Sequence, residues 1–444
     1  MNLKSIFFVI IIPLFLTQPL RAMPVENILN FNNEAGNYLY TPLPSAALEA
    51  KRTNSIRELS DQQMTGRYVR TGDMVNLVLE NLPDGYEASA IIGFLPMWGN
   101  EQGQQEIALA EGENQFDSKQ DGPLFVRITL PEGKQDSATK IAVRVKGGSP
   151  LPLYVDGETS ANEWQAQLSA YSDAPFVQLF GKHSMITLPR DVYHSYPVID
   201  PSETFAVIDR VLDLEDELAG FDDTQPTDVR SLLRQHFLVS FRTPKREQNA
   251  FYMYTTDQFI GMLEYNTQDL TNPERLREEW VIWHEVGHTH QQASWTWDSL
   301  MEISTNLFSL YVQEQMGKTN RLDVPQEDGT SPREKVEEYL RNRPPNYVSE
   351  IGKDNYNDNF IRLVMFDQLR LAYGWELITR IFKHYRMHPL LDDALQSEKV
   401  DNFIEVLCRI SCNDLRPFLS RWQFHASYEA NQKIDTMRLP VRDL

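Results

Sequence analysis

The sequence predicts an α+β multidomain protein in which an N-terminal β-sandwich precedes a mixed segment and a mainly helical C-terminal part. Three observations support this prediction. The 444 residues exceed one average domain, so two or three domains are expected. Short apolar runs separated by turn residues dominate up to about residue 170, which is typical of strands. Apolar residues at helical spacing dominate after about residue 320.

Residues 1–22 are predicted to form a signal peptide. Lys4 supplies the positive start, residues 6–16 form an uncharged apolar run, and Ala22 is a small residue at the expected cleavage point. The alternative is an N-terminal membrane anchor, but the run is short for a bilayer span and contains Pro13. We therefore expect a secreted or extracellular protein, or a periplasmic one, with no stable membrane insertion after cleavage.

The chain is strongly acidic. Lys and Arg number 42 and Asp and Glu 63, which gives a net charge of −21, and loss of the predicted signal changes this to 40 − 63 = −23. Such a surface repels phosphate backbones, so nucleic acid is excluded as a partner. No feature of the sequence indicates an oligomeric state.

The chain has two cysteines, Cys408 and Cys412. They lie four residues apart, and an i, i+4 pair can bridge near a helix end in an oxidising compartment. We expect a small structural disulfide here. The alternatives are a pair of free thiols or a metal site.

The predicted elements follow in order from the N-terminus. Residues 23–54 are polar and mixed and are expected to form a leader or linker. Residues 55–170 are expected to form the β-sandwich, because turn residues such as Pro83-Asp84-Gly85 separate several short apolar runs. The strand candidates are residues 74–79, 88–94, 124–130 and 141–145.

Residues 171–320 mix both patterns, and residues 321–444 are expected to form a helical subdomain. The mixed segment has a helix candidate at 205–218 that could continue through 228–235, and strand candidates at 237–241 and 250–254. The C-terminal helix candidates are residues 332–341, 359–372, 375–385 and 401–410.

The mixed segment carries a metal-binding motif, His284-Glu285-Val286-Gly287-His288. A helix is expected to start at Asn272-Pro273 and to run to about Gln292. Histidines four residues apart on a helix project from one face, as two zinc ligands require. The glutamate beside the first histidine is the usual base in this HExxH pattern, where zinc acidifies a water molecule and the carboxylate takes its proton.

The third ligand is expected to be Glu302. The metzincin pattern is excluded, because Gln291 and Ser294 occupy the positions where it requires Gly and His. A second helix is expected from Asp298 to a C-cap at Gly317, with Glu302 one turn in, as in a gluzincin-like catalytic domain that binds Zn²⁺. Two other carboxylates compete less well: Asp298 suits the helix cap, and Glu314 lies on a different face.

Several residues near the motif are candidates for supporting roles. Asn306 lies four residues after Glu302 on the same helix face, where it could support a ligand. Trp295 and Trp297 lie in the loop between the two helices. Core packing is the favoured interpretation for both, and the alternative is that one stacks on a sugar or aromatic group of a substrate.

The chain resembles the enhancin-like, mucin-degrading zinc metallopeptidases. The segment Trp280–His288 with Gln291 resembles the family's HExxH helix, and residues 302–308 resemble its Glu-x-x-x-Asn ligand helix. The resemblance spans roughly residues 60–425. It implies cleavage of O-glycosylated glycoproteins such as mucins. Where the family usually has a Gly-Tyr-Pro-like segment this chain has residues 261–266, so Tyr265 is a candidate cleft residue and oxyanion donor.

The sequence therefore predicts a secreted zinc endopeptidase with His284, His288 and Glu302 as ligands and Glu285 as general base. Two alternatives remain. One is a general secreted metallopeptidase without a glycan requirement. The other is a glycan-binding adhesin with a structural zinc site, which an intact Glu285 argues against, because a structural site needs no base.

Overall fold

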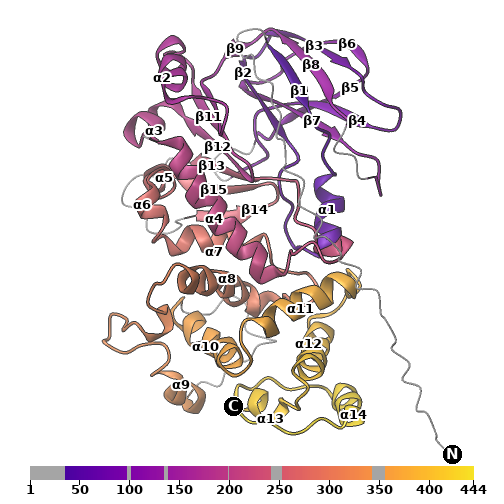
Figure 1. Ribbon diagram of the computed structural model, residues 1–444, viewed down its shortest axis with the longest axis vertical. Coiled ribbons are helices and arrows are strands. Elements are labelled where there is room, and N and C mark those ends of the chain that lie inside the picture. Colours follow the sequence, from indigo (N-terminus) through magenta and orange to yellow (C-terminus); the bar gives the residue numbers. More distant parts are fainter. Residues whose placement is uncertain (1–35, 98–101, 135–138, 199, 242–252, 343–355) are drawn as a thin grey trace, which may run out of the picture.

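The computed structural model describes residues 36–97, 102–134, 139–198, 200–241, 253–342 and 356–444. The predicted signal peptide lies outside the described residues. The protein is α+β, with a β-sandwich at one end, a mixed sheet with helices in the middle and a helical part at the other end (Figure 1). Within the described residues, no helix is both long enough and apolar enough to span a bilayer.

Two facing antiparallel sheets form the sandwich. The first has the order β1-β8-β3-β6 and consists of β1 (Asn37–Tyr40), β3 (Met74–Glu80), β6 (Gly112–Asp117) and β8 (Ile141–Lys146). The second has the order β5-β4-β7-β2-β9 and consists of β2 (Gln63–Val69), β4 (Glu87–Ile92), β5 (Gln105–Leu109), β7 (Gly122–Thr129) and β9 (Ser149–Pro150). Val75, Leu77 and Leu79 alternate into the core between the sheets, so the period-2 pattern predicted β3 correctly.

The sandwich begins and ends earlier than the sequence indicates. β1 pairs with β8, so the predicted leader at 23–54 contributes a strand to the sandwich. It is followed by the helix α1 (Ala46–Thr53). At the other boundary, β10 (Leu153–Val155) pairs with β11 (Phe176–Phe180) of the next sheet, so the sandwich ends near residue 150 and not at 170. A strand's local pattern does not reveal which sheet it joins.

The middle of the molecule contains a six-stranded mixed sheet of order β10-β11-β12-β13-β15-β14. Its further strands are β11 (Phe176–Phe180), β12 (Ser184–Pro189), β13 (Gln235–Phe241), β14 (Met253–Thr256) and β15 (Phe259–Leu263). Its flanking helices include α2 (Ala161–Ala170), α3 (Arg190–Ser195), α4 (Pro201–Ala219) and α5 (Thr267–Thr271). Residues 228–235 do not extend a helix as predicted, because α4 ends at Gly220 in the left-handed conformation and β13 begins at Gln235.

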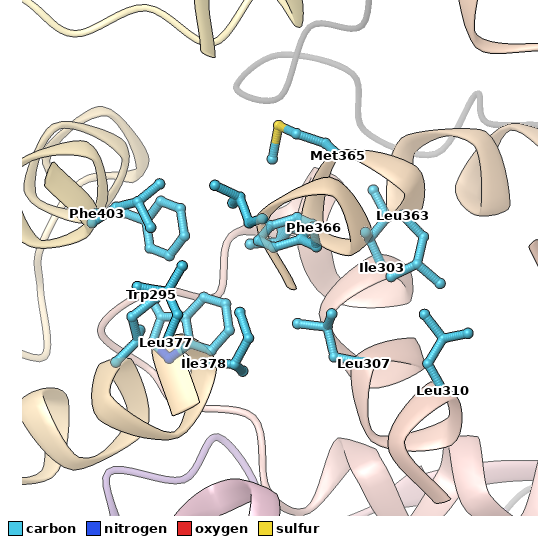
Figure 2. Packing of buried hydrophobic residues seen from close by; sticks show 14 of the residues in the cluster. Trp295, Ile303, Leu307, Leu310, Leu363, Met365, Phe366, Leu377, Ile378 and Phe403 are labelled. Atoms are coloured by element: carbon cyan, nitrogen blue, oxygen red, sulfur yellow. The ribbon is translucent and has the colours of Figure 1, made fainter. Parts of the chain in front are cut away.

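The helical part packs around one large apolar core (Figure 2). It comprises α8 (Met301–Gln315), α9 (Val336–Asn342), α10 (Tyr356–Tyr373), α11 (Glu376–Met387), α12 (Gln396–Ser411), α13 (Arg416–Arg421) and α14 (Tyr428–Met437). Ile303 and Leu307 of α8 belong to the same cluster as Phe366 and Phe403. The core therefore runs across the boundary predicted at residue 320.

Trp295 and Trp297 belong to this core and not to a substrate site. Their exposed fractions are 1% and 2%. Trp295 stacks on Phe403 with ring centroids 5.4 Å apart, and Trp297 stacks on Phe424 at 5.6 Å. Figure 2 shows Trp295 among Leu377, Ile378 and Phe403. The suggestion that either ring stacks on a substrate is therefore wrong.

The expected disulfide is also wrong, because Cys408 and Cys412 are both free. Cys408 faces the core from α12, where burial raises the pKa of its thiol to about 11. Cys412 is the left-handed residue that ends α12 (φ 55°), and its side chain is exposed. The change of backbone direction at the helix end turns the two side chains apart, so i, i+4 spacing alone does not favour a bridge.

His236 of β13 gives the fold a predicted dependence on pH. The ring lies 3.0 Å from Thr187 Oγ1 and packs edge-on against Phe125 of the sandwich. Burial lowers its pKa to about 3. Between the unfolded pKa of about 6.5 and this value only the unfolded chain binds the proton, so stability falls as the pH falls.

We therefore expect replacement of His236 by Gln to flatten the loss of stability with acidification. Across pH 6 to 4 the wild type should lose about 1.4 kcal/mol per pH unit more than His236→Gln. Denaturant unfolding at pH 7, 6, 5 and 4 measures both slopes. Equal slopes would show that His236 is not kept neutral by the fold.

Candidate metal centre

The predicted motif lies on a short helix, α7 (Trp280–His288), in which the Glu279 carboxylate accepts from Val281 N. A separate turn, α6 (Pro273–Leu276), precedes it, with the Asn272 side chain accepting from the first amides as expected. The predicted single helix from 273 to 292 is thus two helices. The chain stops being helical after His288.

α7 packs closely against α8, and Gly287 is what allows this approach. A Cβ atom at Gly287 would lie 2.7 Å from Thr305 Oγ1 and 2.8 Å from Thr305 O. Such distances are too short for any side chain at this position. The Thr305 hydroxyl also donates to the carbonyl of His284. The glycine before the second histidine therefore brings the ligand helix and the Glu302 helix together.

Three predicted ligands meet at one point. His284 Nε2 lies 3.1 Å from Glu302 Oε2, and His288 Nε2 lies 3.8 Å from the same oxygen. The imidazole rings are 4.7 Å apart and almost perpendicular. Zinc bound tetrahedrally at about 2.0–2.1 Å holds its ligand atoms about 3.3 Å apart. The observed spacing brackets that value, so these side chains fit a zinc ion.

The other ring nitrogen of each histidine faces a fixed acceptor. His284 Nδ1 lies 2.8 Å from Asn306 Oδ1, and His288 Nδ1 lies 2.8 Å from Gln291 Oε1. Asn306 Oδ1 also accepts from Trp280 Nε1, which fixes the orientation of its amide. A histidine that donates from Nδ1 leaves the Nε2 lone pair free for a cation. The side-chain amides of Asn306 and Gln291 therefore favour the histidine form that can bind a metal.

Electrostatics keep Glu302 ionised. Partial desolvation would raise the pKa of its carboxyl, but the hydrogen bond from His284 and nearby positive charge, including that of Arg57, lower it to about 2. Burial lowers the pKa of His284, and the contact with Glu302 raises it again to above its usual value. An ionised carboxylate is the form that binds a cation.

The competing carboxylates are occupied elsewhere. Glu314 accepts from Arg370 and from Trp375 Nε1, at 3.0 and 3.1 Å. Asp298 accepts from Gln396 Nε2 at 2.7 Å. The ligand atoms of His284, Glu285 and His288 also lie within 4.8 Å of one another. Glu302 is the better third ligand, because its Oε2 lies 3.1 and 3.8 Å from the two histidine Nε2 atoms, whereas Glu285 Oε2 is engaged by the Thr255 hydroxyl.

Glu285 lies beside this cluster with 6% of its surface exposed. The Thr255 hydroxyl on β14 lies 2.7 Å from Glu285 Oε2. Sequence reasoning missed Thr255, because nothing marks one threonine of a short strand 30 residues upstream of the motif. It had no role for Gln291 either, although a Gln three residues after the second histidine can reach that ring.

Tyr265 and His290 are two further residues near the motif in the sequence. Tyr265 is half-buried in a short turn, Glu264–Asn266, directly after β15, and its role as a cleft residue stays a prediction. His290 pairs with Asp216 of α4 at 2.9 Å. This contact joins the turn after α7 to α4, which is a structural role.

The arrangement of this site, with HExxH on one helix and a glutamate on the next, is the one typical of gluzincin-type metallopeptidases. Residues 147–423 match the family model of peptidase M60, enhancin and enhancin-like. The chain belongs to this family, as its sequence motifs predicted.

The chain is also similar to individual proteins, in sequence and in structure. A TRPM8 channel-associated factor homolog from Xenopus laevis is 24% identical over 313 residues, which cover 68% of this chain and 31% of that protein. The chain thus spans about a third of the length of this curated relative. A conserved protein from Bacillus anthracis superposes with a TM-score of 0.78 at 26% identity, over 92% of this chain and 80% of the other.

A second solved structure, a metallopeptidase in complex with Tn antigen, has a TM-score of 0.75 at 19% identity. The match covers 92% of this chain and 79% of that one. At this identity the likeness shows the shared fold.

Proposed function

We propose that this protein is an exported zinc endopeptidase that hydrolyses peptide bonds in glycoproteins of the O-glycosylated, mucin type. The observation that carries the proposal is the convergence of His284, His288 and Glu302 on one point, with Glu285 beside them. Export rests on the signal-like residues 1–22.

The ligands and the base have separate tasks in this proposal. His284, His288 and Glu302 would hold zinc, which when bound supplies a Lewis acid that acidifies water and polarises the scissile carbonyl. Glu285 takes the proton of the attacking water and passes it to the leaving amine. A carboxylate can do both because it accepts the proton in the first step and returns it in the second.

The sheet offers a place for the peptide. β14 is the edge strand of the six-stranded sheet in the described part of the chain, and it lies beside the zinc helix. An extended peptide that pairs with an exposed edge strand gains main-chain hydrogen bonds. A substrate lying along β14 would thus pass Glu285, which contacts Thr255 of this strand.

The glycoprotein substrate is a more specific proposal than peptidase activity itself. It is supported by the family resemblance and by the structural relative that was solved with the glycan Tn antigen. A general peptidase with the same zinc site would cut a bare polypeptide equally well. The glycan requirement is therefore a separate question from peptidase activity.

Digestion of one mucin-type glycoprotein before and after enzymatic removal of its O-glycans tests the proposal. We expect cleavage of the glycosylated form, no cleavage in the presence of a zinc chelator, and at least about tenfold slower cleavage of the deglycosylated form, a factor worth 1.4 kcal/mol. Equal cutting of both forms would show a general peptidase. Zinc-loaded protein that binds the glycoprotein and cuts neither form would show the adhesin instead.

A further inference from the structure

Thr255 makes two contacts with the same residue. Its Oγ1 lies 2.7 Å from Glu285 Oε2 and 2.7 Å from the main-chain oxygen of Glu285. The carboxylate and the main-chain carbonyl can only accept hydrogen bonds, so the hydroxyl is the donor. Its single proton is shared between the two oxygens.

The main-chain contact has a structural reason. The last carbonyls of a helix lack amide partners within it, and Glu285 lies in the last turn of α7. The amide of Thr289, which would continue the helical pattern, donates to Val286 O instead. The Thr255 hydroxyl therefore contacts a carbonyl that the helix leaves without its usual partner.

The side-chain contact makes the two carboxylate oxygens of Glu285 different from each other. Oε2 is held by Thr255, whereas no hydrogen bond to Oε1 is found within the described residues. A base must present one oxygen to the attacking water, and a free glutamate side chain rotates about three torsions. With Oε2 held, Oε1 is the oxygen left to face a water molecule, and the Glu285 carboxylate lies within 4.8 Å of ligand atoms of both histidines.

Thr255 itself is held in place. It belongs to the β14–β15 hairpin, where Thr255 pairs with Ile260. Gln258 N at the turn donates to Glu58 O at 2.8 Å, and the Gln258 side-chain amide donates to the Glu58 carboxylate at 2.9 Å. The hydroxyl is thus presented by a hairpin that is anchored at its turn, which is what positioning of a reactive group requires.

We propose that Thr255 is a positioning residue for the general base: it holds Oε2 of Glu285 and so aims Oε1 at the attacking water. The inference rests on the proposed function. In the reaction, the water oxygen forms a bond to the carbonyl carbon while its proton moves to Oε1. That proton then moves to the leaving amine as the C–N bond breaks. Thr255 keeps its own proton, and its contact with Oε2 persists through both steps.

Matched threonine variants test this. Thr255→Val keeps the shape and removes the hydroxyl, and Thr255→Ser keeps the hydroxyl. Thr65→Val makes the same change in the sandwich, where the Thr65 hydroxyl also donates to a main-chain oxygen, that of Leu124. Misplacing a reactive group by about 1 Å can cost about 100-fold, so we expect kcat of Thr255→Val per bound zinc to fall about 10- to 100-fold. KM and zinc content should stay near wild type. Thr255→Ser should recover most of kcat, and Thr65→Val should match the kcat of wild type.

Crystal structures of zinc-loaded wild type and Thr255→Val supply a readout that does not depend on activity. We expect the Glu285 carboxylate to leave its wild-type orientation in the variant. An unchanged carboxylate, or an unchanged kcat per zinc with a lower melting temperature, would show that Thr255 only caps the helix and would overturn the inference. If wild type cuts no peptide, the proposed function fails, and the two structures still decide the role of Thr255.

Discussion

Replacement of Glu285 by Gln is expected to abolish peptide hydrolysis while leaving zinc bound. A general base contributes about 10²- to 10⁴-fold to a rate, so kcat should fall by this amount. The amide has nearly the shape of the carboxylate, and its oxygen can still accept from Thr255, which lies 2.7 Å from Oε2. The ligands His284, His288 and Glu302 are unchanged, so the zinc content should be unchanged.

The measurement is kcat on a mucin-type glycopeptide together with zinc content per chain. Glu278→Gln is the matched control: Glu278 is exposed and pairs with Lys318 on the surface, so the same chemical change there should have no effect. Full activity of Glu285→Gln would remove Glu285 from the mechanism. A zinc-free but folded Glu285→Gln would mean that Glu285 is a ligand.

The convergence of the three proposed ligands could be predicted from sequence because its geometry is mostly local. His284 and His288 lie on one helix, so their spacing fixes their relation. Glu302 lies on the next helix, α8, which begins at Met301 after the short connection that follows His288. Gly287, which the family pattern includes, proves to be required by the contact with Thr305.

What sequence reasoning missed depends on contacts between distant segments. Thr255 reaches Glu285 from a strand 30 residues upstream, and β1 joins β8 across about a hundred residues. Neither contact produces a local pattern in the sequence from which it could be predicted. The disulfide prediction failed for a different reason. The i, i+4 spacing argument assumed a regular helix through both cysteines, whereas α12 ends at Cys412, whose backbone is left-handed.

Replacement of Glu302 by Ala is expected to reduce zinc affinity strongly and activity with it. Loss of a residue that only supports a ligand costs about 10- to 100-fold in metal affinity, so loss of a ligand should cost more than about 100-fold. Competition with a chelator of known affinity measures this directly. In wild type, added zinc should raise the melting temperature, and in Glu302→Ala the shift should largely disappear at the same zinc concentration.

Glu314→Gln on the same helix is the matched control, because Glu314 pairs with Arg370 and contacts Trp375 away from the histidines. It should bind zinc like wild type. The comparison also separates the two candidate ligand sets. If Glu285 were the third ligand, Glu302→Ala would keep its zinc and Glu285→Gln would lose it. The 3.1 Å approach of Glu302 to His284, beside a Glu285 already engaged by Thr255, predicts the opposite pattern.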